Sequence, residues 1–187
     1  IIPLGPLLRI ASAMTDLATD VYIGTFISVQ PKLLEQINRC ANHASDIVFI
    51  AQLLDDVCPE LIHDFVLRTN DEVDRLITET VDDIVRGIES FRRRSSATVV
   101  VHNFVQPHGA GQGIYEAASR NSQAEAIRKL NRQLVESLKP MPGTHVLDFD
   151  RMCAEIGYHR WHDQKMWYLG RAPLAAPPVP VLRARRP

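Results

Sequence analysis

The sequence predicts an α/β fold, a three-layer α/β/α sandwich built on a mostly parallel sheet. Four short apolar runs, rich in β-branched residues, alternate with longer segments of helical periodicity. The short runs are almost continuously hydrophobic, which is typical of strands buried on both faces. This alternation implies βαβ crossovers, which are right-handed in nearly all known sheets.

The predicted elements alternate along the chain. A first helix is expected over residues 4–18, and a second opens at Pro31, because proline is favoured in the first helical turn. The predicted strands span residues 21–26, 46–53, 97–104 and 145–149. Since such a sheet normally opens with a strand before its first helix, a further strand preceding Ile1 is expected.

The longest predicted helix covers residues 69–94. Thr69 and Glu72 fit the T-x-x-E capping box at its start, and apolar residues then recur three or four positions apart. We interpret Arg92 to Arg94 as the solvated end of this helix, where the helix dipole favours cations, in preference to a nucleic-acid patch.

A further helix is predicted over residues 122–139. Ser122 is its expected cap, with Glu125 three residues later, and Pro140 ends it. Asn131 is expected on the helix surface. The residues expected to face the core are Ile127, Leu130, Leu134 and Leu138.

Composition limits the function classes. With 187 residues, 45% of them hydrophobic, the chain suits one domain over residues 1–176, followed by a Pro/Arg-rich linker or tail over 177–187. A net charge of −1 argues against nucleic acid or an anionic membrane as a partner. No apolar run reaches the roughly 20 residues of a membrane helix, so we expect a soluble, cytoplasmic protein. The ends suggest a piece of a larger polypeptide.

Ligands of open parallel sheets bind beyond the carboxyl ends of the strands. The most unusual loop there is V-H-N-F-V-Q-P-H-G-A-G-Q-G, in which Asn103 ends a strand and His108 precedes three glycines within five residues. Asn103 and His108 are its candidate ligand-binding residues. The loop lacks a nucleotide-binding fingerprint. It is either a flexible lip or a loop that contacts a small-molecule ligand, and the sequence leaves both interpretations open.

The stretch G-Y-H-R-W-H-D-Q-K-M-W-Y-L-G-R-A-P gathers polar and aromatic residues near the C-terminal end. His162 and Asp163 form the candidate catalytic pair, and Trp161 and Trp167 are candidate ligand-binding residues. His159 and His162 have a spacing that suits a metal ion, but no third ligand is marked, so we expect no metal.

Asp148 and Asp150 imitate the D-x-D that opens the active site of phosphatases of the haloacid dehalogenase (HAD) superfamily. That motif needs Thr or Val where Met152 stands, and residues 151–187 are too few for the later lysine and acids. We therefore expect the two aspartates to end a strand and cap the next helix.

The layout resembles the SGNH hydrolases, which share a flavodoxin-like three-layer fold and carry D-x-x-H near the C-terminus. In them the aspartate orients a histidine that activates a serine from the first strand's loop. Here Met166 stands three residues after Asp163 and cannot accept a proton. If His162 did this work, the serine would lie before Ile1.

Four segments in order resemble the N-terminal, SGNH-like domain of FkbH-like proteins. They are V-V-V-H-N-F-V-Q-P, N-S-Q-A-E-A-I-R-K-L-N-R-Q-L, H-V-L-D-F-D and the stretch from Gly157. The resemblance covers residues 97–176, and the W-x-D-x-x-x-W of Trp161, Asp163 and Trp167 is its most specific part. FkbH-like proteins join this domain to a phosphatase-like domain of HAD subfamily IIIC. They dephosphorylate a glyceryl group and transfer it to an acyl carrier protein in polyketide biosynthesis.

The resemblance implies a non-catalytic or weakly catalytic domain that binds substrate or acyl carrier protein and positions the adjoining HAD-like domain. Trp161 and Trp167 would then seal the edge of the sheet while Asp163 accepts hydrogen bonds. The alternative is an SGNH-type esterase, or an acyl or glyceryl transferase, that uses Asp163 and His162 with a serine outside this chain. Neither interpretation places a cofactor in this chain.

Overall fold

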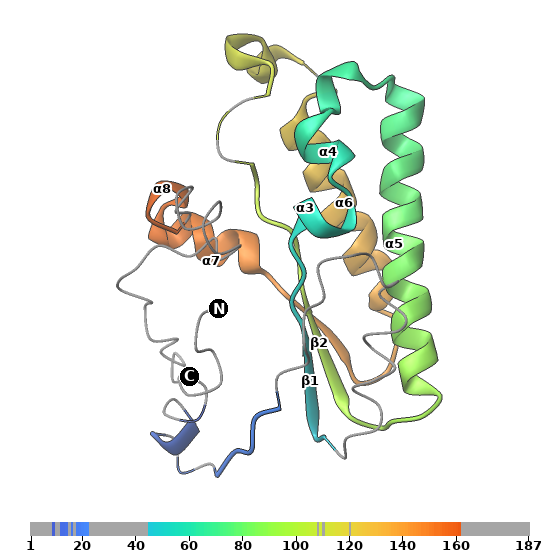
Figure 1. Ribbon diagram of the computed structural model, residues 1–187, viewed down its shortest axis with the longest axis vertical. Helices are drawn as coiled ribbons and strands as arrows, with labels where there is room; N and C mark the ends of the chain where they lie inside the picture. The colour runs from blue at the N-terminus through green and yellow to red at the C-terminus, as the bar shows by residue number, and fades with distance from the viewer. Residues whose placement is uncertain are drawn as a thin grey trace. The chain divides into compact units, whose positions relative to one another are not determined.

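The computed structural model describes residues 45–161 except 108, 110 and 120, together with residues 9, 12–14, 16 and 18–22. The side chains of His159 and Trp161 lie outside this description. The chain divides into two compact units, one of Ile1–Thr25 with Ile156–Pro187 and one of Phe26–Glu155. The second unit holds the sheet and most of the described helices (Figure 1).

In the first unit, an ion pair of 2.9 Å joins Arg9 Nη2 to Asp20 Oδ1, and α8 (Tyr158–Trp161) is a single helical turn. Residues 9, 12 and 13 are helical, in agreement with the helix predicted over residues 4–18. Residues 21 and 22 are not in a strand, and the rest of the strand predicted there lies outside the described residues. The helix predicted from Pro31 also lies outside them.

Three parallel strands form the sheet in the described part of the chain: β1 (Ile47–Ile50), β2 (Thr98–His102) and β3 (Thr144–Leu147). Their order in the sheet is their order in the sequence. The register pairs Phe49 with Val100 on one side of β2 and Val101 with Val146 on the other. The parallel sheet expected from the sequence is confirmed.

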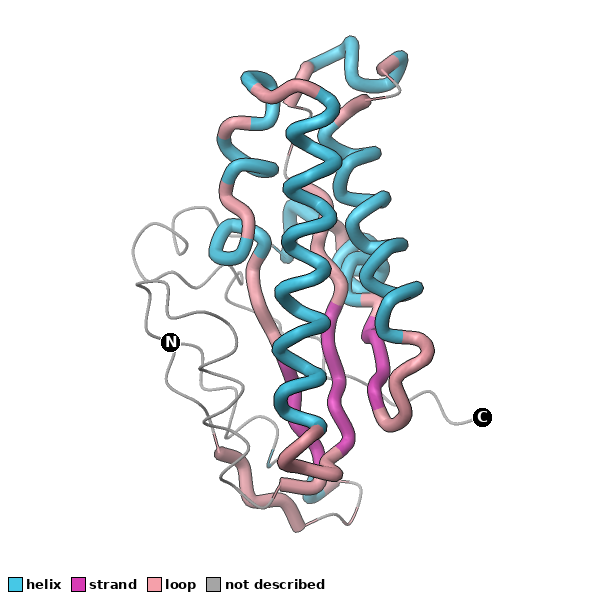
Figure 2. Tube along the Cα trace, turned by 90° about the vertical axis from the view of Figure 1, so that its right-hand side faces the viewer, coloured by secondary structure: helices cyan, strands magenta, loops and turns pink. Residues whose placement is uncertain are grey.

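Two long helices connect the strands. α5 (Asn70–Arg92) links β1 to β2, and α6 (Gln123–Leu138) links β2 to β3. Because both crossovers step across the sheet in the same direction and have the same hand, both helices lie on one face. Figure 2 shows α5 running across the front of the strands with α6 beside it. Helices packed around a small parallel sheet make the molecule an α/β sandwich, as predicted.

Shorter elements complete the unit. They are α3 (Leu54–Val57), α4 (Glu60–His63) and the 3₁₀ helix η1 (Phe65–Leu67) after β1, the 3₁₀ helix η2 (Gly113–Ala118) before α6, and α7 (Phe149–Ile156) after β3.

The core lies between the helix layer and one face of the sheet. Its fully buried side chains come from α4, α5, β2 and α6, and the largest are Leu61, Ile77, Ile84, Ile88, Phe91, Val99, Ile127, Leu130, Leu134 and Leu138. The inward stripe predicted for residues 122–139 is therefore confirmed in full. Burial of each such side chain contributes about 1.5–3 kcal/mol relative to leaving it in water.

The opposite face of β1 is not buried, which corrects the expectation of strands buried on both faces. Val48 and Ile50 are 9% exposed, whereas Ile47 is 57% and Phe49 is 60% exposed. The alternation arises because successive side chains of a strand point to opposite faces, and α5 and α6 cover only one of them. The uninterrupted hydrophobicity of the run conceals this alternation.

The predicted helix caps are present. Thr69 Oγ1 accepts from the backbone N–H of Glu72, and Glu72 accepts in return from the backbone N–H of Thr69, which completes the capping box. The backbone N–H and the hydroxyl of Thr69 both donate to Glu72 Oε2, and they hold the pKa of Glu72 below its ordinary value. At α6, Ser122 Oγ accepts from the backbone N–H of Glu125 at 3.1 Å.

Arg92 differs from its expected role as a solvated helix end. Its guanidinium donates to the backbone carbonyl of Ala97 at 2.7 Å and to that of Pro142. It thereby joins the end of α5 to the segments that enter β2 and β3. Arg93 and Arg94 are exposed, as predicted.

Candidate functional site

Polar side chains meet where β2 and β3 end. Asn103 directly follows β2 and is only 8% exposed. Its Nδ2 donates to Asp148 Oδ1 at 2.8 Å, and its Oδ1 accepts from the backbone N–H of Asp150 at 2.9 Å. The amide of Asn103 therefore fixes the start of α7 against the end of β2.

The two aspartates also act locally. Asp148 Oδ1 accepts from the backbone N–H of Arg151 at 3.2 Å, in the pattern of a helix cap, and Asp150 Oδ1 accepts from the backbone N–H of Gln106 at 2.8 Å. The prediction that Asp148 ends a strand and caps the next helix is confirmed. Asp150 instead holds the chain that leaves β2.

Asn131 completes this arrangement from α6. Its Oδ1 accepts from the backbone N–H of Phe104 and its Nδ2 donates to the carbonyl of the same residue, both at 2.8 Å. The expectation that Asn131 lies on the helix surface is wrong. Its position beside Leu130, in the inward stripe, was the available signal, since a side chain adjoining a buried stripe can reach a neighbouring loop. We name Asn103, Gln106, Asn131, Asp148 and Asp150 the strand-end junction.

His102 is the last residue of β2 and lies beside the junction. It was not predicted as a site residue from the sequence. Its ring packs against Phe149 at a centroid distance of 4.7 Å and edge-on against Phe104 at 6.4 Å. Its Nδ1 lies 2.7 Å from the carbonyl oxygen of Asn103. Burial disfavours the charged imidazolium and lowers the pKa of His102 below its ordinary 6.5. The neutral ring, with Nδ1 as the donor, fits this position.

The glycine-rich loop is anchored at its far end. A Cβ on Gly111 would lie 2.8 Å from Gln123 Oε1, so the close approach requires glycine there. Gln123 is itself fixed, because its Nε2 donates to the carbonyls of Leu61 and Ile62. The carboxylate of Glu116 accepts from the backbone N–H groups of Gln112 at 3.1 Å and Ala124 at 3.0 Å. This part of the loop is held in place by its own hydrogen bonds.

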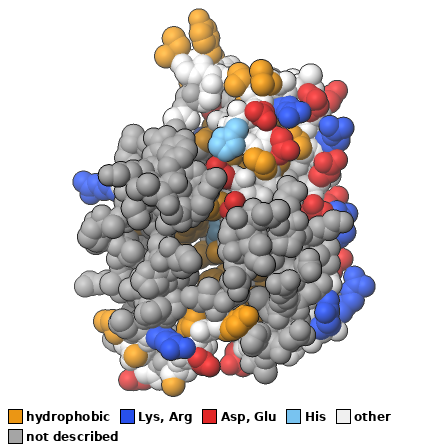
Figure 3. Space-filling view, viewed as in Figure 1, with side chains coloured by type: hydrophobic (Ala, Val, Ile, Leu, Met, Phe, Trp, Pro, Cys, Tyr) orange, Lys and Arg blue, Asp and Glu red, His pale blue; other side chains and the backbone are white. Residues whose placement is uncertain are grey.

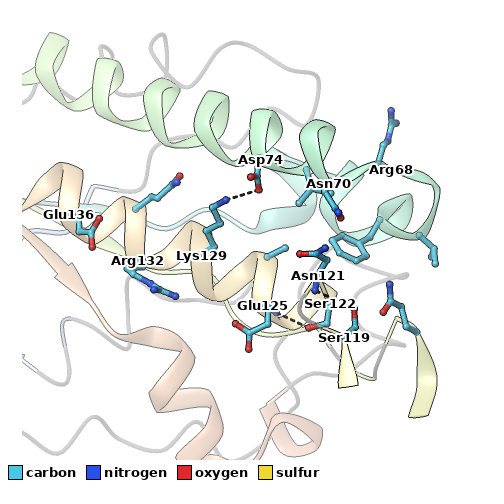
Figure 4. A pocket seen from close by; sticks show the side chains of 16 residues that line it. Arg68, Asn70, Asp74, Ser119, Asn121, Ser122, Glu125, Lys129, Arg132 and Glu136 are labelled. Carbon is cyan, nitrogen blue, oxygen red and sulfur yellow. Dashed lines mark hydrogen bonds and ion pairs between the residues drawn. The ribbon is translucent and has the colours of Figure 1, made fainter. Parts of the chain in front are cut away.

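An open depression of about 690 Å³ lies between the start of α5 and the length of α6 from Glu125 to Glu136, beside η1 and the segment that precedes α6. Figure 4 shows its lining. Lys129 bridges the two helices through a 2.7 Å ion pair with Asp74, while Glu125 pairs with Arg128. The rest of the lining includes Asn70, Asn121, Ser119, Gln133, Arg132 and Glu136. With both signs of charge present, the depression favours no single class of ion.

Most of the site residues predicted from sequence lie outside the described residues. His108, His162, Asp163 and Trp167 are among these, and Trp161 ends α8 with an undescribed side chain. Asn103 stands at the carboxyl end of β2, where it was expected. Contact of these residues with a ligand, and catalysis by His162 and Asp163, stay predictions.

Neither described cysteine is suited to nucleophilic chemistry. Cys58 and Cys153 are buried and free. Burial, with a smaller contribution from Asp150, raises the pKa of Cys153 to about 12, and burial also raises the pKa of Cys58. Both thiols therefore stay protonated near neutral pH. Within the described ranges, no three His, Cys, Asp or Glu side chains come together as a metal site, and no helix is long and apolar enough to cross a bilayer.

The fold recurs in a solved protein. The N-terminal part of the protein BF1531 from Bacteroides fragilis, which contains a phosphatase domain and was crystallised with Mg, superposes with a TM-score of 0.69 at 14% sequence identity. The match covers 92% of this chain and 44% of that chain, so this chain spans less than half the length of its structural neighbour. No protein-family model and no curated protein matches the sequence. At this identity the likeness establishes a shared fold.

Proposed function

We propose that this chain is the SGNH-like N-terminal domain of an FkbH-type protein. In this role it binds a small substrate or an acyl carrier protein and positions an adjoining phosphatase-like domain, with little or no catalysis of its own. The whole protein would act in glyceryl transfer to the carrier protein during polyketide assembly.

The observation that carries the proposal is the structural match. A solved protein that contains a phosphatase domain shares the fold over 92% of this chain, while more than half of that protein lies outside the match. This agrees with the order of motifs over residues 97–176, which resembles the FkbH type. The two lines of support are independent, because one rests on backbone geometry and the other on the sequence.

The chemistry of the strand-end junction argues against catalysis by Asn103. In esterases of this fold, an amide at a strand end donates to the developing oxyanion. Here Asn103 donates to Asp148 and accepts from Asp150, so its orientation is set by the fold. Asp148 and Asp150 likewise accept from backbone groups. These interactions hold the chain after β2 in a fixed place, and they argue against a role for Asn103 as an oxyanion donor.

Isothermal titration calorimetry with a phosphopantetheinylated acyl carrier protein tests the proposal. We expect heat of binding with the parent chain and weaker binding with His108→Ala, because His108 lies in the loop that would contact the ligand. His145→Ala is the matched control, since His145 is an exposed histidine on β3. No heat with the parent chain, together with no change in elution on size exclusion, would contradict the proposal.

A further inference from the structure

The ring of His102 has one nitrogen that is engaged and one that is open. Nδ1 lies 2.7 Å from the backbone carbonyl oxygen of Asn103, which can only accept, so Nδ1 carries the proton and Nε2 is an acceptor. Among the described residues none donates to Nε2. In this part of the chain, the side-chain atoms that are both buried and without a partner are Gln106 Oε1 and Thr144 Oγ1, so Nε2 stays in contact with solvent.

The sheet face on which His102 lies is open on the side of β1. The register pairs Phe49 with Val100, and alternation along β2 then places His102 on the same face as these two residues. Figure 1 shows α5 on one side of the strands and the start of α7 on the other. Phe49 is 60% exposed, and Ala51, which follows β1, is exposed as well. In the same view, Figure 3 shows hydrophobic side chains of described residues at the surface. A small molecule therefore has access to this face beside His102.

The surroundings of His102 favour an uncharged ligand. Because burial lowers the pKa of His102, its ring is neutral near pH 7 and does not attract anions. Phe149, whose ring packs against the imidazole, stands in the chain between Asp148 and Asp150, and these two carboxylates repel anions. The exposed ring of Phe49 offers apolar surface to the carbon atoms of a ligand.

We propose that His102 is a ligand-binding residue, whose Nε2 accepts a hydrogen bond from a hydroxyl group of a small, uncharged ligand. The ligand lies on the open face at the carboxyl ends of β1 and β2, which is the end of a parallel sheet where ligands bind. The inference rests on the proposed function, in which the substrate carries a glyceryl group. It narrows that substrate to the form that has lost its phosphate.

Saturation-transfer difference NMR with methyl glycerate, an uncharged glyceryl compound, tests the inference on this chain. We expect a ligand signal with the parent chain and a severalfold weaker signal with His102→Phe, because phenylalanine can pack against Phe149 but has no acceptor. His102→Gln should retain most of the signal, since its amide oxygen can take the place of Nε2. His63→Phe is the matched control, because His63 is an exposed histidine on α4, and it should leave the signal unchanged.

Carbethoxylation by diethyl pyrocarbonate, mapped by mass spectrometry, tests the parent chain without any substitution. The reagent attacks an unprotonated imidazole nitrogen, so we expect it to label His102 and methyl glycerate to slow this labelling severalfold. 3-Phosphoglycerate at the same concentration should protect His102 much less, because both of its charged groups would lie beside Asp148 and Asp150. Absence of labelling without a ligand would overturn the inference. Equal labelling with and without methyl glycerate, or stronger protection by 3-phosphoglycerate, would also overturn it.

The inference and the proposed function fail in different ways. If carrier protein binds while methyl glycerate leaves the labelling of His102 unchanged, only the inference about His102 is wrong. If methyl glycerate protects His102 while carrier protein gives no heat, the glyceryl site stands and the proposed function loses its carrier protein. If His102→Phe unfolds, the protection measured on the parent chain still decides between these outcomes.

Discussion

Replacing Asn103 with alanine removes two hydrogen bonds from the strand-end junction at once. The first runs from Nδ2 to the carboxylate of Asp148, and the second runs to Oδ1 from the backbone N–H of Asp150. A bond to a charged group contributes about 1.5–3 kcal/mol and a neutral one about 1 kcal/mol. Because Asn103 is only 8% exposed, water cannot fully replace these partners. We expect the free energy of unfolding to fall by about 2–4 kcal/mol.

Urea denaturation followed by circular dichroism measures this change. Asn121→Ala is the matched control, because Asn121 is exposed, and it should alter the free energy of unfolding by less than about 0.5 kcal/mol. Asn131→Ala should resemble Asn103→Ala, since both of its amide atoms bond the backbone of Phe104. A loss below about 0.5 kcal/mol for Asn103→Ala would refute the reasoning that the junction fastens β2 to α7.

Three further predictions follow from particular contacts. Gly111→Ala should lower the free energy of unfolding by about 1–3 kcal/mol in urea denaturation, because its Cβ would meet Gln123 Oε1 at 2.8 Å; an unchanged midpoint would contradict this. Ser122→Ala should lower the free energy of unfolding by about 1 kcal/mol in the same assay, because it removes the side-chain oxygen that accepts from the backbone N–H of Glu125. An unchanged free energy would show that this cap does not stabilise the fold. Burial lowers the pKa of His102 below 6.5, so the folded state resists protonation, and the free energy of unfolding should fall as the pH drops below that value. Denaturation measured between pH 7 and pH 5 should show a shallower fall for His102→Gln than for the parent chain. Equal slopes for the two proteins would exclude His102 as the cause.

The helices were the most predictable part of the fold. The side-chain oxygens of Thr69 and Ser122 cap the first turns of their helices, and each accepts from a residue only three positions later. The signal is therefore contained in a few neighbouring residues. The inward stripe of α6 also follows from spacing alone, because one helical face must be buried. Such features need no knowledge of the rest of the chain.

The strands and the junction were harder to predict, because both depend on distant partners. Phe49 belongs to a run that is almost continuously hydrophobic, yet it is exposed because α5 and α6 cover the other face of the sheet. Asn131 bonds Phe104, 27 residues earlier, and Asn103 bonds Asp148, 45 residues later. The periodicity of α6 places Asn131 beside the buried stripe, but it does not identify the backbone of Phe104 as its partner. The partner of Asn131 can be predicted only once the position of the loop that contains Phe104 is known.

The most direct test of the central claim, that this domain binds and positions without catalysing, is labelling with a fluorophosphonate probe. The probe should be applied to the longer polypeptide, so that any upstream serine is present, and to its His162→Ala variant. We expect neither protein to be labelled. Labelling of the parent that is lost in His162→Ala would contradict the account and establish the alternative, an SGNH-type esterase or transferase that uses His162 and Asp163.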